Sequence, residues 1–520
     1  MSEKKKDAWT IMIYMAGDNN LTDECVYSLM EMKKVDLGQS VNVIAQFDPR
    51  DDYLPTHRYR ITHNQAHGSL IKDRSDTAPF ENESLRAKRN ASIREKAKEA
   101  AQEAAARIAA EEASKELSKS VRRGAPPPTI ILPVADDDVR TDETDTGSPV
   151  TLYNFMSACI NQFPAEHYMV VLNGHGAGTG RDFLLKDDSP TGSLTMNELK
   201  LAFEELQPEL NDQGKQAIDI LGMDVCLMSM AEICFELKGL AEIIVGCESY
   251  SPASGWPYFN ILDRLRKDFS KPAQKDAPSQ FAKAIVEEYV SFYSDYWLGG
   301  LSVDQSALDM RRADDLRQQI NLVGDALADK LEKKDAQEAE AFKRALILAH
   351  WEAQSYNGEL FVDFADFCDC VIKYCDDENI RMLCAQAASF VRNEFVLKSC
   401  YSGPMYQYSN GVSIYFPWSK VEDNYSNLDF VKASEGRGWA RFIKSATELT
   451  RREVRTVKTE AADNLFEINR TTPPQFRISS GKGPDVPMHS MRNPPIVWDP
   501  RVCLDEGESI VPEIERLFLS

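Results

Sequence analysis

Strand-length apolar runs recur along this chain and alternate with stretches of helical spacing. A run that is apolar at nearly every position is typical of a strand buried on both faces of a parallel sheet. Five runs have this pattern: 9–16, 41–47, 167–173, 218–225 and 241–247. The stretches at 21–34 and 148–161 have the amphipathic spacing of helices. The alternation predicts an α/β fold with a mostly parallel sheet flanked by helices.

Other regions depart from this alternation. Residues 81–128 are dense in Ala, Lys, Glu and Arg, which favours a charged helix inserted between strands. Residues 309–351 and 361–395 have long helical spacing, and a last strand is expected at 411–417. From residue 450 onward the chain is proline-rich, so an irregular tail is expected there.

A histidine and a cysteine follow two of the buried strands. His175 lies among glycines after the run at 167–173, and Cys226 ends the run that begins at Ile218. If the two strands are parallel neighbours, both side chains lie at the carboxyl edge of the sheet, where open α/β sheets place reactive groups. A histidine beside a thiol is the minimal arrangement for nucleophilic catalysis. Most cysteines only pack in cores, so the glycine-flanked histidine is what favours a catalytic pair.

Five motifs in this order resemble the clostripain-like cysteine peptidases. They are Trp9–Leu21, Asn173–Gly176, Asp224–Met228, Gly255–Tyr258 and Asn410–Pro417. The resemblance runs, with gaps, from about Trp9 to about Ile443. It implies a caspase-like fold and a cysteine endopeptidase that cleaves after basic residues. Arg is expected to be preferred over Lys, because a carboxylate can pair bidentately with a guanidinium.

The resemblance also implies catalytic roles. His175 would be the general base and Cys226 the nucleophile. The backbone N–H groups of Gly176 and Cys226 are expected to stabilise the oxyanion. The sequence indicates no third catalytic side chain.

The same resemblance implies a substrate pocket. Asp224 would lie at the floor of the pocket for the basic side chain. The loop that follows the strand at 241–247 would line it, with Glu248, Ser249 and Trp256 as the expected contacts. A surface position for Glu248 is an equally good interpretation of the sequence.

These features divide the chain into three parts. A caspase-like peptidase domain is expected at 1–305, interrupted by the charged helical insertion at about 81–128. A helical portion at 306–449, which includes the strand at 411–417, would complete the fold. The proline-rich extension covers 450–520.

The charge and composition of the chain exclude some classes of binding partner and favour one cellular compartment. The chain has 60 Lys and Arg against 82 Asp and Glu, a net charge of −22, so it lacks the basic excess that nucleic-acid binding needs. We expect basic protein or peptide substrates instead. Neither a signal peptide nor an apolar run of about 20 residues is present, so no membrane association is expected. Eleven cysteines without a framework spacing predict free thiols in a reducing cytoplasm.

No cofactor is expected for this chemistry. The glycines around His175 do not match G-x-G-x-x-G, and no P-loop is present. A calcium site in the acidic loop at 136–145 stays open as an alternative, although EF-hand spacing is absent. Four cysteines lack the paired spacing of a zinc site and are interpreted as helix-core residues: Cys368, Cys370, Cys375 and Cys384.

An Arg-specific peptidase that was always active would damage its own cell, so a precursor activated by cleavage is expected. The polar, turn-rich segment between the two catalytic residues carries Arg181 and Lys186 and is expected to be an exposed loop. Members of the family are cleaved in this region.

Arg122 and Arg123, at the end of the insertion, are the expected site for an upstream protease. Analogy with other caspase-fold enzymes suggests bacterial defence.

Two alternatives stay open. One is a caspase-fold peptidase with another P1 preference, against which the charge of Asp224 argues. The other is a catalytically silent scaffold in a signalling or defence complex. The presence of both His175 and Cys226 argues against that scaffold.

Overall fold

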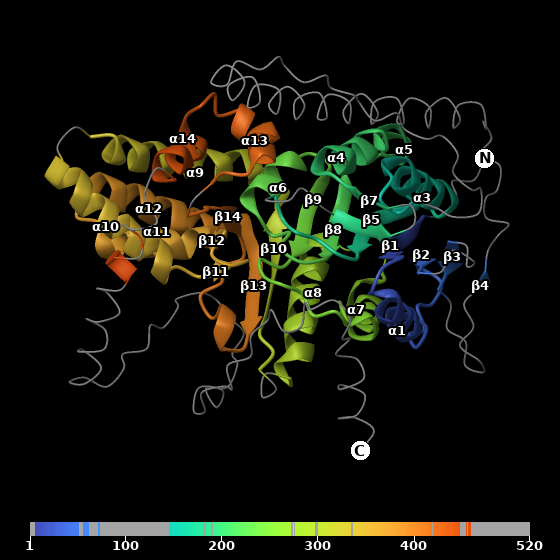
Figure 1. Ribbon diagram of the computed structural model, residues 1–520. Coiled ribbons are helices and arrows are strands. Elements are labelled where there is room, and N and C mark those ends of the chain that lie inside the picture. The colour runs from blue at the N-terminus through green and yellow to red at the C-terminus, as the bar shows by residue number, and fades with distance from the viewer. Residues whose placement is uncertain are drawn as a thin grey trace, which may run out of the picture.

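The five apolar runs form the middle of a nine-stranded sheet (Figure 1). The computed structural model describes residues 6–50, 56–61, 71–72, 145–179, 184–188, 191–271, 274, 276–296, 300–333, 336–418, 420–447, 454 and 456–458. The strands stand in the order β13 (Val396–Ser402), β10 (Val303–Asp309), β9 (Ala241–Gly246), β8 (Ile218–Asp224), β5 (Ala165–Asn173), β1 (Asp7–Gly17), β2 (Val41–Pro49), β3 (His57–Arg60) and β4 (Ile71–Lys72). The strands from β9 to β2 are parallel, whereas β10, β13, β3 and β4 are antiparallel to their neighbours. The predicted α/β class with a mostly parallel sheet is confirmed.

Alternate residues of the central strands face two separate cores. In β1, Met12 and Tyr14 pack in one hydrophobic cluster, whereas Ile11 and Ile13 pack in the other. Because both faces are covered, every position of the strand after Asp7 is buried. This explains why the run reads as continuously apolar rather than alternating.

Helices cover both faces of the sheet (Figure 1). One face carries α3 (Pro149–Gln162), α4 (Met196–Glu204), α5 (Gln207–Asp212) and α6 (Ala231–Glu236). The opposite face carries α1 (Thr22–Met32), α7 (Tyr258–Arg264) and α8 (Ala277–Ser294). Local signals agree with these starts: α3 has Pro149 in its first turn, and Thr195 and Glu198 form a capping box at α4.

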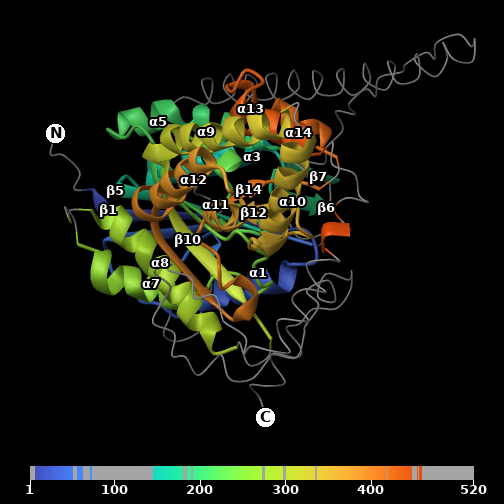
Figure 2. The ribbon, with the colours of Figure 1, turned by 90° about the vertical axis from the view of Figure 1, so that its left-hand side faces the viewer.

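The C-terminal portion is mostly helical and packs beside the sheet (Figure 2). Its helices are α9 (Ala313–Leu331), α10 (Ala336–Glu352), α11 (Phe364–Tyr374), α12 (Glu378–Phe390), α13 (Asp429–Lys432) and α14 (Gly438–Ala446). A small antiparallel sheet joins β11 (Ser355–Tyr356), β12 (Phe361–Asp363) and β14 (Ser413–Tyr415). The four cysteines of α11, α12 and the turn between them are free and buried, as expected of core residues.

The expected boundary at 305/306 falls within β10. That strand pairs with β9 on one side and with β13 on the other. The two expected portions of the chain therefore build one sheet together. The expected helical stretch at 309–351 is two helices, α9 and α10, and the stretch at 361–395 begins with strand β12.

Several strands were not predicted, and β10 shows why. Its middle residues Asp304, Gln305 and Ser306 are polar yet fully buried. Asp304 accepts hydrogen bonds from the backbone N–H groups of Glu248 and Ser249. A strand whose buried middle positions are polar has no apolar run to reveal it.

Some expectations concern residues outside the described part of the chain. These are the insertion at 81–128 with Arg122 and Arg123, Arg181, and most of the acidic loop and of the extension at 450–520. Among the described residues, no helix is long and apolar enough to cross a membrane.

Candidate active site

The register of β5 and β8 brings His175 and Cys226 to the same edge of the sheet. The two strands are parallel neighbours, and Asn173 lies opposite Asp224. His175 and Cys226 each stand two residues beyond that pair. The backbone N–H of Gly174 donates to the carbonyl of Asp224 (3.3 Å), so the two chains stay together past the strand ends. The condition that the sequence analysis set for a catalytic pair is therefore met.

Gly176 is required by the closeness of the two loops. A Cβ atom at Gly176 would lie 2.7 Å from the carbonyl oxygen of Cys226. Such a contact is shorter than real Cβ atoms allow, and the atom on the other side is backbone, which cannot swing away. A side chain at Gly176 would therefore push the loop of His175 away from the loop of Cys226.

The imidazole of His175 is held from the end of β1. Nε2 of the ring lies 2.7 Å from Oδ1 of Asn20. The backbone carbonyl of His175 accepts a hydrogen bond from the N–H of Leu185 (2.8 Å). Burial lowers the pKa of His175, and the nearby cation of Lys186 lowers it further, while the carboxylate of Asp188 opposes this. His175 is therefore neutral at neutral pH and can accept a proton.

Cys226 is the least buried of the described cysteines. Of the ten cysteines in the described part of the chain, all are free and only Cys226 is not fully buried. Burial raises its pKa to about 11; the N–H of Ser251, 3.3 Å from Sγ, opposes the rise, and the charge of Asp224 adds to it. The resting thiol therefore keeps its proton and needs a base to become a nucleophile.

The two backbone N–H groups expected to form the oxyanion hole have no hydrogen-bond acceptor within the described part of the protein. Within the described ranges, neither the N–H of Gly176 nor that of Cys226 donates a hydrogen bond. Both lie where the two loops meet. Donors without an internal partner are what an oxyanion hole requires, because the acceptor arrives with the substrate.

Asp224 is buried beside the pair, and its two oxygens are used differently. Oδ2 accepts from Nδ2 of Asn173 (2.7 Å), the hydroxyl of Tyr258 (2.8 Å) and the N–H of Trp256 (3.2 Å). Oδ1 is buried and has no hydrogen-bond partner in the described structure. Burial raises the pKa of Asp224 to about 6, although the three donors oppose the rise. The carboxyl is mostly ionised at neutral pH.

Trp256 is not placed as the sequence suggested. Its side chain is buried in the core, and a Cβ atom at Gly222 would lie 2.8 Å from its ring. Only its backbone N–H reaches Asp224. The expected contact between the indole and a substrate is not supported by this position.

Glu248 is neither in an open pocket nor on the surface. It is completely buried, and its Oε2 accepts from the N–H of Gly411 (2.8 Å). Burial and the charges of Asp363 and Asp304 hold its pKa well above the usual range. Both interpretations of the sequence are wrong for this side chain, because β10 and β12 enclose it.

The carbonyl of Ser249 accepts from Leu227 (2.9 Å), so Ser249 fixes the backbone beside Cys226.

Lys186 lies in a strand, not in the expected exposed loop. It belongs to β6 (Leu184–Asp188), which pairs with β7 (Thr191–Leu194). The carbonyl of Lys186 accepts from Nδ2 of Asn19 (2.8 Å), and its Nζ pairs with Asp188 (2.9 Å). The polar, turn-rich sequence around Lys186 hid the hairpin from the prediction. The hairpin is held by leucines of both strands that pack in the core, and by backbone hydrogen bonds to Asp18 and His175.

Asn173, Tyr258 and Asn20 are residues of this site that the sequence analysis did not assign. A signal for Asn20 was present. It follows the apolar run of β1, and β1 is the parallel neighbour of β5, so the ends of both strands share one edge. Tyr258 ends the motif Gly255–Tyr258, but nothing in that motif indicates that its hydroxyl reaches Asp224 from a helix.

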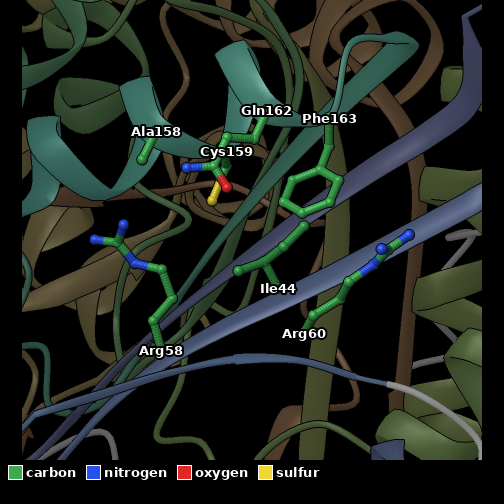
Figure 3. A pocket seen from close by; sticks show the side chains of 7 residues that line it. All are labelled: Ile44, Arg58, Arg60, Ala158, Cys159, Gln162 and Phe163. Atoms are coloured by element: carbon green, nitrogen blue, oxygen red, sulfur yellow. The ribbon is translucent and has the colours of Figure 1, made fainter. Parts of the chain in front are cut away.

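A small hollow lies apart from this edge (Figure 3). Its lining comes from β2, β3 and the region of α3: Ile44, Arg58, Arg60, Ala158, Cys159, Gln162 and Phe163. None of the expected site residues lines it. Within the described ranges, no group of three or more His, Cys, Asp or Glu side chains is arranged to hold a metal ion.

Comparison with known proteins places the chain in a family. The model of the Clostripain family matches residues 13–446. Clostripain from Hathewaya histolytica is 22% identical over 317 residues, which cover 53% of this chain and 58% of clostripain. The match thus spans somewhat more than half the length of that relative.

Solved structures share the fold. A secreted C11 cysteine protease from Bacteroides thetaiotaomicron in complex with an irreversible peptide inhibitor is 13% identical, with a TM-score of 0.51 over 82% of this chain and 98% of its own. The structure of the Bacteroides thetaiotaomicron protease called iotapain gives the same identity and TM-score over 83% of this chain and all of its own. At 13% identity this similarity supports the expected fold, and it does not indicate which substrate the chain cleaves.

Proposed function

The chain belongs to the clostripain family of cysteine peptidases, and on that premise we propose that it is an endopeptidase that cleaves after basic residues through His175 and Cys226. One observation carries this proposal. The register of β5 and β8 brings the least buried cysteine of the described residues and a neutral histidine to the same edge of the sheet.

The chemistry proceeds in two stages. His175 takes the proton of Cys226, and the thiolate attacks the carbonyl carbon of the scissile peptide bond. The N–H groups of Gly176 and Cys226 stabilise the negative oxygen of the tetrahedral intermediate. The imidazolium then protonates the leaving amine, which leaves a thioester. Water, deprotonated by His175, hydrolyses the thioester and restores the thiol.

Asp224 supplies the preference for a basic P1 side chain, with Arg favoured over Lys. Its Oδ1 is the buried acceptor without a donor, so the P1 cation binds there. A second N–H of a guanidinium reaches Oδ2 only if one of the three present donors gives way. The preference for Arg is therefore moderate, because full bidentate pairing competes with bonds already made.

Activation by cleavage is part of the proposal. Cutting after Arg181 or Lys186 is self-processing, and cutting after Arg122 or Arg123 belongs to an upstream protease. Cleavage after Lys186 requires the β6–β7 hairpin to open, because the scissile carbonyl is bound by Asn19. The free cysteines of the described residues support work in a reducing compartment such as the cytoplasm.

The test compares wild type with Cys226→Ala on fluorogenic peptides that differ only at P1. Cys226→Ala is expected to lose measurable turnover of Arg and Lys substrates while keeping its melting temperature, because the sulfur lies at the edge of the sheet. The same samples are analysed by mass spectrometry for fragment ends at the four proposed basic sites.

Cys159→Ala is the control, since it removes a buried sulfur on α3 that lines the hollow of Figure 3. It should keep activity. Substantial turnover by Cys226→Ala would sink the mechanism. Full activity of an uncut wild-type chain would remove only the activation step.

A further inference from the structure

Asn20 contacts the general base directly. Its Oδ1 lies 2.7 Å from Nε2 of His175, although the two residues are 155 positions apart in the chain. Within the described structure, the side chain of Asn20 makes no other hydrogen bond. It is also exposed, so it does not serve the core. The contact with His175 is the interaction that this amide makes.

The turn that presents Asn20 is held firmly by its neighbours. Nδ2 of Asn19 donates to the carbonyls of Ala16 (2.9 Å) and Lys186 (2.8 Å), and Oδ1 of Asn19 accepts from the N–H of Leu21 (2.8 Å). The hydroxyl of Thr22 donates to the carbonyl of Gly17 (2.6 Å). Because these bonds fix the backbone on both sides of Asn20, its position toward His175 is set by the fold rather than by chance.

The contact determines which nitrogen of His175 can react. An amide oxygen only accepts, so Nε2 carries the hydrogen and donates it to Asn20. In the neutral imidazole the lone pair then lies on Nδ1, which is the nitrogen left to take the proton of Cys226. After that transfer the Nε2–H belongs to an imidazolium, and hydrogen bonds from charged donors are stronger than neutral ones. The bond therefore gains strength as the reaction begins.

We propose that Asn20 is a positioning residue that holds His175 in the reactive tautomer and orientation and stabilises its protonated form. This inference rests on the proposed mechanism of His175 and Cys226. Asn20 acts through His175 and does not itself touch the reacting atoms. The charged side chains that face the imidazole, Lys186 and Asp188, both come from β6 and are retained in every variant below.

The experiment uses the full chain with Asn20→Ala and Asn20→Asp. Asn20→Ala removes the acceptor and is expected to lower kcat by about 10- to 100-fold, with KM changed less than about twofold. Asn20→Asp keeps an acceptor at the same place and is expected to recover most of kcat. Asn393→Ala is the matched control, because Asn393 is an exposed asparagine that bonds only to Ser389 within the described residues. It should match wild type.

A second readout separates positioning from mere structure. The pKa of His175 is measured by NMR of histidine-labelled protein in the Cys226→Ala background, where no turnover interferes. Asn20→Ala should lower this pKa, because the imidazolium loses its acceptor, and Asn20→Asp should raise it, because a carboxylate favours the charged ring. A merely structural role would leave the pKa unchanged.

Two results would overturn the inference. One is an Asn20→Ala enzyme within about twofold of wild type in kcat. The other is an Asn20→Asp enzyme as impaired as Asn20→Ala with no shift in the pKa of His175, since the amide would then act as a donor or a spacer. Activity retained by Cys226→Ala is a separate outcome, which refutes the proposed function itself and is not confused with either.

Discussion

Asp224 and Glu248 are two buried carboxyl groups near the ends of β8 and β9, and their surroundings are opposite. Asp224 accepts three hydrogen bonds, all from neutral donors. Glu248 accepts one from Gly411 and otherwise faces Asp363 and Asp304. Burial raises both pKa values, but only to about 6 for Asp224 and well above the usual range for Glu248.

The difference shows that a carboxyl group near a catalytic edge need not carry charge. At neutral pH Asp224 is mostly negative and can attract a cation. Glu248 keeps its proton, because a second or third negative charge in the same buried space is too costly. The sequence predicts a place in the pocket for both. Only the neighbours from other strands separate a charged receptor from a neutral structural residue.

The largest expected effect is the loss of activity when the carboxylate of Asp224, but not that of Glu248, is replaced by an amide. Asp224→Asn should lower kcat/KM for Arg substrates by about 30- to 1,000-fold, because the proposed site for the P1 cation loses its ionised carboxylate. Glu248→Gln should stay within about threefold of wild type, since a neutral amide resembles a protonated carboxyl. Steady-state kinetics on one Arg peptide measures both. Equal losses in the two variants would show that Glu248 is charged after all.

A smaller effect is expected from pH. With a pKa of about 6, Asp224 is about one-tenth ionised at pH 5 and almost fully ionised at pH 8. The ratio of kcat/KM between wild type and Asp224→Asn should therefore rise about tenfold from pH 5 to pH 8. Ionisation of His175, on which Asp224 does not act, affects both proteins equally and cancels in the ratio. Cys226, whose pKa of about 11 is set mainly by burial, keeps its proton from pH 5 to pH 8. A ratio that does not change with pH would contradict the charge assigned to Asp224.

The smallest expected effect tests whether both carboxylate oxygens of Asp224, or Oδ1 alone, bind the P1 side chain. Tyr258→Phe removes one donor from Oδ2, so a guanidinium can reach both oxygens, and the Arg-to-Lys ratio of kcat/KM should rise roughly twofold to fivefold. Tyr425→Phe is the control, because it removes the same kind of bond from Glu232, a buried carboxyl held against β14. An unchanged ratio in Tyr258→Phe would mean that Oδ2 takes no part in recognition.

The sequence alone determined the class of fold and the edge at which the chemistry lies. Strands such as β5 and β8 are buried on both faces, so each reads as a nearly continuous apolar run, and the residues that follow each strand are placed at the carboxyl edge. His175 and Cys226 could therefore be found without coordinates. The pairing of the two strands was an assumption that the register then met.

Only the tertiary structure decided the partners of these residues. The charge of Glu248 depends on Asp304 and Asp363, which lie on strands that carry too little apolar pattern to be predicted. The orientation of His175 depends on Asn20, which reaches it from the turn that follows the neighbouring strand β1. Hydrogen bonds and pKa values act over a few ångströms in space, whatever the separation along the chain, and the local patterns of a sequence do not contain those distances.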